Sequence, residues 1–231
     1  MHLTSTHRVL VLAVAAVAGA YFLTAPAPAD VAQRAADPAI SRTDVARSTH
    51  IVKYGAYVSI FGLVTASGGT LQSNGVVRLE RQLHGQSEQS TFSKRALTSA
   101  PPRWTFRPSR TGTYQLYFLG KTGVITASTS DYVRIAVRRN LNDRWRSTDR
   151  TYYGKVLPNY RGRPVYIQRS TCTSPSSGSC SWSAYKTVTT NTYGNWAVRL
   201  PNPASRTHFR GYVPPSNGYG GALSNRIVTL Y

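Results

Sequence analysis

Hydrophobic and polar residues alternate with a period of two along most of the chain. The alternation is clear in residues 58–64, 133–137 and 196–200, where every second side chain is apolar apart from Gly62. Successive side chains of a strand point to opposite faces, so this period is typical of strands with one buried face. Turn residues such as those at 201–203 separate the runs. Outside the first thirty positions we find no sustained helical period, so an all-β protein is predicted.

Several short segments recur in the same order about 92 residues later in the chain. The matching pairs are Gly62-Leu63-Val64 with Gly154-Lys155-Val156, Val77–Arg81 with Val165–Arg169, Trp104–Arg107 with Trp196–Arg199, and Ser109-Arg110-Thr111 with Ser205-Arg206-Thr207. A repeat of this length is the size of one small β-sandwich and exceeds the unit of a solenoid. We therefore predict two antiparallel β-sandwich domains, over residues 48–138 and 139–231.

Three stretches of the second copy carry a family resemblance: YGKVLPNYRGRPVYIQR, SWSAYKTVTTNTYGNWAVRLP, and THFRGYVP followed by ALSNRIV. They resemble the immunoglobulin-like and fibronectin-like β-sandwich repeats of bacterial secreted proteins, and the first copy fits more loosely. The resemblance implies two tandem immunoglobulin-like domains that serve as spacer, adhesion or binding modules. Thr111-Gly112-Thr113-Tyr114 is similar to a tyrosine corner, in which the phenol hydroxyl bonds to nearby backbone.

The first thirty residues have the pattern of an export signal. A basic pair at 7–8 precedes an apolar run at 9–23, and Ala27-Pro28-Ala29 has small residues where a signal peptidase reads. The run is short for a membrane-spanning helix, which needs about 20 residues. We expect a cleaved signal at 1–29, a polar linker at 30–47, and a secreted, extracellular protein associated with the cell wall. With the signal cleaved no membrane span would remain; an uncleaved anchor is the alternative.

The two cysteines fit an oxidising compartment. Cys172 and Cys180 flank the turn-forming loop Thr-Ser-Pro-Ser-Ser-Gly-Ser after the predicted strand 165–169. Thiols that face each other across a hairpin are within disulfide reach, and disulfides persist outside the cytoplasm. The alternative is a redox or metal pair, but metal sites need three or four ligands and His208 stands alone in the sequence. We predict a structural disulfide.

The sequence lacks the residue patterns of catalysis. No two carboxylates fall on one face of a predicted strand, and there is neither a Gly-x-Ser-x-Gly elbow nor a phosphate-binding glycine loop. His50, His84 and His208 are interpreted as solvent or loop histidines. Trp104 and Trp196, which share one repeat position, are assigned to the core rather than to a sugar-stacking platform. We expect a protein that is not an enzyme and has no metal site and no cofactor.

Positive charge is the one functional signal. The chain has 28 Lys and Arg against 8 Asp and Glu, a net charge of +20, and no carboxylate side chain follows Asp149. GC-rich coding explains part of the arginine excess but not the missing carboxylates. A field of one sign attracts polyanions. Arg161 and Arg163 stand in a predicted turn before the outward-facing Tyr166, and Arg169 ends the same strand, so these four residues are the predicted polyanion-binding site.

Together these features favour a secreted, non-enzymatic module that acts at the cell envelope in binding, adhesion or spacing. The expected partner is an anionic cell-wall polysaccharide or another polyanion. The alternative is a secreted basic effector or inhibitor directed at an anionic target. Helix-turn-helix and RNA-recognition signatures are absent from the sequence, so sequence-specific nucleic-acid binding is not expected.

Overall fold

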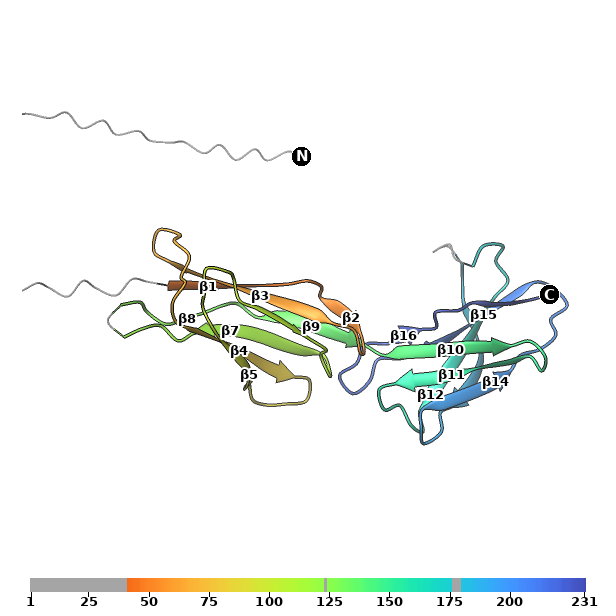
Figure 1. Ribbon diagram of the computed structural model, residues 1–231. Helices are drawn as coiled ribbons and strands as arrows, with labels where there is room; N and C mark the ends of the chain where they lie inside the picture. Colours follow the sequence, from red (N-terminus) through yellow and green to blue (C-terminus); the bar gives the residue numbers. More distant parts are fainter. Residues whose placement is uncertain (1–40, 123, 176–179) are drawn as a thin grey trace, which may run out of the picture. The chain divides into compact units, whose positions relative to one another are not determined.

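The computed structural model describes residues 41–122, 124–175 and 180–231, which form strands and loops (Figure 1). The predicted all-β class is confirmed, because every regular element of these residues is a strand. In the same part of the chain, no helix has the length and apolar character required to cross a membrane. The predicted signal at 1–29 and the predicted linker up to residue 40 lie outside the described residues.

Residues 41–138 form two sheets. Their strands are β1 (Ser41–Arg47), β2 (Ile51–Lys53), β3 (Val58–Ala66), β4 (Val76–Leu83), β5 (Ser90–Ala96), β6 (Arg103–Phe106), β7 (Gly112–Phe118), β8 (Ser128–Thr129) and β9 (Val133–Arg138). One sheet has the order β1-β3-β6, and the other has the order β2-β9-β7-β4-β5 with β8 paired to β7. The β2–β9 pair is parallel and the other named pairs are antiparallel.

Residues 140–230 repeat this plan. Their strands are β10 (Asn140–Arg146), β11 (Thr151–Leu157), β12 (Pro164–Ser170), β13 (Ser183–Thr189), β14 (Asn195–Arg199), β15 (Thr207–Val213), β16 (Ala222–Leu223) and β17 (Val228–Leu230). One sheet has the order β10-β11-β14, and the other has the order β13-β12-β15-β16 with β17 also paired to β15.

The strand order defines an immunoglobulin-like sandwich in each half. Apart from the short strands, the first, second and fifth strands form one sheet, and the third, fourth, sixth and last form the other. The fourth strand pairs with the third, whereas in a constant-type immunoglobulin domain it lies beside the fifth, so the arrangement is immunoglobulin-like. The sequence repeat maps onto it, because Val77 and Val165 lie on the equivalent strands β4 and β12, and Trp104 and Trp196 lie on β6 and β14. The predicted fold class is therefore confirmed.

Two separate hydrophobic clusters hold the sheets together. The first joins residues of both N-terminal sheets, such as Ile60 and Leu116, and the second does the same in the C-terminal half with Tyr152 and Ile167. Burying such a side chain fully contributes about 1.5–3 kcal/mol to stability. Each sheet gains this contribution only when its apolar face packs against the other sheet. Trp196 is 4% exposed and, like Trp104, belongs to the core as predicted.

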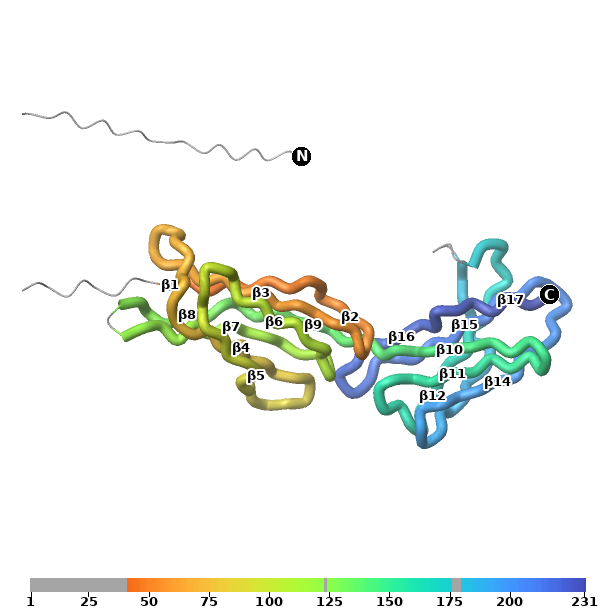
Figure 2. The backbone as a smooth tube through the Cα atoms, in the orientation of Figure 1, coloured from red at the N-terminus to blue at the C-terminus, as the bar shows by residue number. Residues whose placement is uncertain are grey.

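The linker prediction was wrong at its C-terminal end. Residues 41–47, assigned to the linker, form β1, which pairs with β3 along its whole length from Ser41–Ala66 to Arg47–Ile60 (Figure 2). The segment lacks apolar residues except Val45 and Ala46, so its sequence looked like a linker. Backbone pairing at a sheet edge needs little side-chain hydrophobicity, and Ser41 instead bonds through its hydroxyl to Ser128.

The predicted tyrosine corner does not form. Tyr114 is fully buried on β7, but its hydroxyl has no hydrogen-bond partner among the described residues. Burial raises the pKa of this phenol to about 12. The ring packs at 5.3 Å from that of Phe106, so Tyr114 serves the core through its ring rather than through its hydroxyl.

A buried arginine lies where the chain passes from β9 to β10. Arg139 is 1% exposed, and its guanidinium lies 4.6 Å from the ring centroids of both Tyr160 and Tyr219. It donates hydrogen bonds to the carbonyl oxygen of Pro158 and to both the carbonyl and the hydroxyl oxygen of Ser216. Burial lowers the pKa of Arg139. Carbonyls and ring faces thus replace the missing carboxylate partner of this cation.

Candidate anion-binding groove

The structure places the four predicted polyanion-binding residues on and before β12. Arg161 is exposed and Arg163 is half-buried in the turn between β11 and β12, while Arg169 is exposed near the end of β12. Tyr166 faces outward as predicted, with 36% of its surface exposed and its ring 6.3 Å from that of Tyr212. Within the described chain no hydrogen bond or ion pair joins these four side chains, so their action as one site stays a prediction.

A recess with several basic lining residues lies elsewhere, over the outer face of the sheet β10-β11-β14. It is an open groove of about 770 Å³. Strand register arranges three rows of outward side chains there, which are Asn142–Lys155–Asn195, Arg144–Tyr153–Ala197 and Arg146–Thr151–Arg199. We call the surface made of these nine residues the basic groove. Eight of them line the recess, and Arg199 lies beside it on the same sheet face. The residues between them along the strands, such as Tyr152 and Val198, point inward and are buried in the second cluster.

Three cations of the basic groove carry no ion pair. Arg144, Lys155 and Arg199 are exposed, and in the described ranges no carboxylate lies within ion-pair distance of any of them. Arg146 differs, because it binds the carboxylate of Asp149 through two hydrogen bonds of 2.9 and 2.5 Å. These bonds hold the pKa of Asp149 at about 2. The groove therefore presents three cations to an external anion and one that is already neutralised.

Tyr153 stands in the centre of the basic groove. Its register neighbours are Arg144 on β10 and Ala197 on β14. The guanidinium of Arg146, which is hydrogen-bonded to Asp149, lies 5.8 Å from the centroid of the Tyr153 ring. Ala197 offers only a methyl group, and both Tyr153 and Ala197 line the recess.

The carboxylate of Asp143 also lines the groove but is engaged from the inner side. It accepts hydrogen bonds from the hydroxyl of Tyr152 at 3.1 Å and from the backbone N–H of Asn225 at 3.0 Å. Burial raises the pKa of Asp143 in spite of these bonds, which lower it. This carboxylate therefore stabilises the rim of the sandwich and is not turned toward the cations of the groove.

Gly154 keeps the floor of the groove continuous. A Cβ atom at this position would lie 2.0 Å from the carbonyl oxygen of Asn142, which is too close for any other residue. Only glycine therefore allows β10 and β11 to stay paired with Lys155 and Tyr153 in their rows. Gly62 holds the equivalent position on β3, where a Cβ would meet the side chain of Leu116 at 2.8 Å.

Sequence reasoning found only part of this site. Lys155 and Arg199 belong to the carboxylate-free region after Asp149, but Arg144 and Arg146 precede it. A signal was present in the alternation Asn142, Arg144, Arg146, which places polar side chains on one face of a strand. Which strands lie beside β10 could not be read from that pattern.

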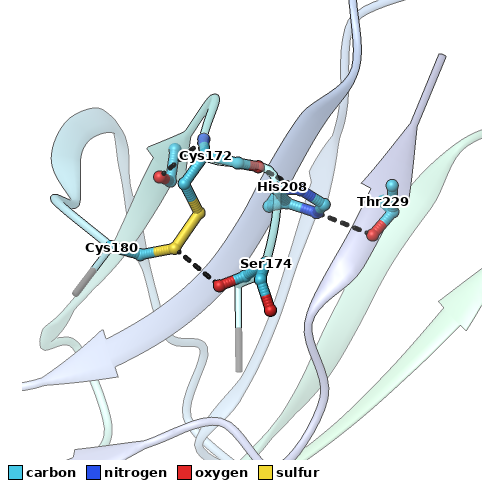
Figure 3. The surroundings of a disulfide bond; sticks show 6 residues. Cys172, Ser174, Cys180, His208 and Thr229 are labelled. Atoms are coloured by element: carbon cyan, nitrogen blue, oxygen red, sulfur yellow. Dashed lines mark hydrogen bonds between the residues drawn. A yellow bond between two sulfur atoms is a disulfide. The ribbon is translucent and has the colours of Figure 1, made fainter. Parts of the chain in front are cut away.

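The predicted disulfide is present, with the Cα atoms of Cys172 and Cys180 5.8 Å apart (Figure 3). The Sγ atom of Cys180 lies 3.0 Å from the carbonyl oxygen of Ser174. A bridged sulfur carries no proton, so this is a close contact and not a hydrogen bond. The bridge closes the connection between β12 and β13, as expected from the sequence.

The assignment of His208 to a solvent or loop position was wrong. This residue lies on β15 with no exposed surface, its Nε2 2.9 Å from the carbonyl oxygen of Cys172 and its Nδ1 2.8 Å from Oγ1 of Thr229 (Figure 3). A carbonyl only accepts, so Nε2 carries the proton and Nδ1 accepts from the threonine hydroxyl. Because both nitrogens are bonded, the imidazole can be buried without an orphaned polar atom. Among the described residues no three His, Cys, Asp or Glu side chains gather in a way that could hold a metal.

Comparisons with known proteins leave the family open. No family model matches the chain, and no curated protein matches it. Among solved structures, the chain is similar to the human OSCAR ligand-binding domain, with 14% identity and a TM-score of 0.32 over 81% of this chain and 97% of that one. It is also similar to the native conformation of Escherichia coli alpha-2-macroglobulin, with 12% identity and a TM-score of 0.31 over 82% of this chain. The match spans 14% of the length of that second protein. The class of the fold rests on the strand order described above.

Proposed function

We propose that the protein is a non-catalytic binding module that holds an anionic polymer in the basic groove. The observation that carries this proposal is the exposure of three cations that have no carboxylate partner in the described chain: Arg144 and Lys155 line the open groove, and Arg199 lies on the same sheet face beside it. Other arginines are satisfied internally, as Arg139 is by tyrosine rings and carbonyls and Arg78 by Glu80. In the groove, by contrast, unpaired cations from three neighbouring strands share one sheet face.

A polymer suits this surface better than a single anion. Each exposed cation attracts an anion weakly in water, because the high dielectric constant and salt screen the interaction. A chain that carries many anionic groups meets several cations at once, and its second and third contacts form at high effective concentration. Binding also releases the counterions condensed on the polymer, which makes the affinity strongly dependent on salt.

The predicted export signal gives this activity a setting. In a secreted protein that stays near the cell wall, the anionic polymers at hand are envelope glycans and related polyanions. Two immunoglobulin-like sandwiches without catalytic groups suit the presentation or spacing of such a contact. Export and wall association are part of this proposal.

Binding of the full chain to fluorescent polygalacturonate and to polyphosphate tests the proposal, with anisotropy measured from about 50 to 200 mM salt. The double variant Arg144→Gln, Lys155→Gln should reduce the slope of log affinity against log salt by about two. The matched control Arg134→Gln, Lys94→Gln removes the same charge from exposed positions on β9 and β5 and should leave the slope nearly unchanged. Equal effects of both variants would show that net charge alone acts, and no binding of either polymer would refute the function.

A further inference from the structure

The basic groove carries more than cations. In the row Asn142–Lys155–Asn195 two amide side chains flank the ammonium group. Nearby, Oδ1 of Asn191 accepts hydrogen bonds from the backbone N–H groups of Tyr193 and Asn195, which fixes this side chain at the rim of the groove. The amides of Asn142 and Asn195 have no hydrogen bond within the described ranges. They offer both donors and acceptors to a ligand.

The phosphate groups of a polymer can match only the donors of these amides, and leave the amide carbonyl oxygens without a partner. The ionised phosphate groups of such a chain present only acceptors at neutral pH, so the carbonyl oxygens of Asn142 and Asn195 would find no donor among them. A sugar ring offers hydroxyls, which donate to an amide carbonyl and accept from an amide nitrogen. The polar half of the groove therefore matches a ligand that carries hydroxyls as well as charge.

The aromatic half of the groove matches the same ligand. Tyr153 is half-buried in the centre of the sheet face, between Arg144 and the small side chain of Ala197. The C–H bonds on one face of a sugar ring pack on a phenol ring, as apolar groups do. A ring that packs against Tyr153 from the Ala197 side lies over β14, where Arg199 and Asn195 are the next outward residues on either side of Ala197. Arg144 lies on the opposite side of the phenol, on β10.

We infer that the ligand of the basic groove is an acidic polysaccharide, with a sugar ring on Tyr153, its carboxylate at Arg199, and hydroxyls on the amides of Asn142 and Asn195. This inference rests on the proposed function and narrows its ligand. The arginine fork binds a carboxylate through two parallel hydrogen bonds, which orients the ring over the phenol. The three rows extend about 13 Å along the strands, so neighbouring sugars of the chain reach Lys155 in the row at the other end.

Titration calorimetry of the full chain with polygalacturonate, polyphosphate and uncharged dextran separates the ligand classes. Polygalacturonate should bind more tightly than polyphosphate at equal charge concentration, and dextran should bind least. Tyr153→Val should weaken polygalacturonate binding about five- to tenfold, in line with the loss of one ring-stacking contact, and change polyphosphate binding less than about twofold. The matched control Tyr132→Val removes an exposed tyrosine just before β9, outside the groove, and should change neither.

If Tyr153→Val folds poorly, a second variant tests the same contact. Ala197→Leu fills the space beside the ring at an exposed position, so it should block the sugar without removing a cation, whereas Ala184→Leu on β13 is its control. Equal affinity for both polymers, with no effect of Tyr153→Val or Ala197→Leu, would overturn the acidic-sugar inference and leave the anion-binding function in place. Failure of both polymers to bind would overturn the function and the inference together.

Discussion

Replacing Tyr114 by phenylalanine should make the protein more stable. The hydroxyl of Tyr114 is buried without a partner among the described residues, and a buried polar group in that state costs about 1–3 kcal/mol. Phenylalanine keeps the ring and its packing at 5.3 Å against Phe106. We expect a gain of about 1 kcal/mol in the free energy of unfolding, measured by urea titration with an unchanged m-value, and a rise of about 2–4 °C in Tm.

The pH dependence gives this prediction a second readout. Burial raises the folded-state pKa of Tyr114 to about 12, above the value of about 10 for an exposed phenol. The stability that this shift contributes is therefore fully present below about pH 10 and is lost as the pH rises toward 12. The wild-type protein should lose stability over this window more steeply than Tyr114→Phe.

Tyr152 is the matched control. It is also fully buried, but its hydroxyl donates to the carboxylate of Asp143, so Tyr152→Phe should destabilise the protein by about 1–2 kcal/mol. Opposite signs for the two variants would support the difference in partners. If Tyr114→Phe destabilises the protein by about 1 kcal/mol or more, the hydroxyl makes the backbone bond of a tyrosine corner, and our description of that site is wrong.

Three further changes have defined outcomes. Asp149→Asn should destabilise the protein at neutral pH but not below about pH 2, because Arg146 holds the pKa of Asp149 at about 2 and this contribution to stability disappears as the carboxylate is protonated. Thermal melts at several pH values measure this, and a difference in Tm between the two proteins that stays constant with pH would contradict it. Replacing Cys172 and Cys180 together by serine should lower the free energy of unfolding by about 1–2.5 kcal/mol without preventing folding, and an unfolded variant by circular dichroism would contradict this. His208→Ala should cost about 2–4 kcal/mol in urea unfolding through its two lost hydrogen bonds and the cavity; a cost below about 0.5 kcal/mol, typical of surface sites, would disprove its burial.

The sequence was sufficient for the class of fold because the relevant signals are local and repeated. Alternation places Val165 and Ile167 inside and Tyr166 outside whichever strands lie beside them, and the structure agrees at each of the three. The disulfide was predictable for a similar reason, since eight positions separate Cys172 from Cys180 and the connecting loop is a turn. Signals of this kind need no knowledge of distant partners.

Other assignments depended on distant partners. The segment 41–47 is too polar for its sequence to predict a strand. It forms one because the edge of β3 was available for backbone pairing. His208 looked like a surface residue because its two partners, Cys172 and Thr229, lie 36 and 21 positions away. Tyr114 matched the motif of a tyrosine corner, but a motif does not place an acceptor within reach of the hydroxyl.

By itself, the sequence determined that the chain folds into repeated β-sandwiches, that one hairpin is bridged, and that positive charge is the feature to explain. Only the tertiary structure decided where that charge is available. Cations far apart in the chain, such as Arg144 and Arg199, share one face because β10 and β14 both pair with β11, whereas Arg139 is buried between tyrosine rings. Charge counts add along a sequence, but a binding surface requires neighbours across strands, and long-range backbone pairing alone sets those neighbours.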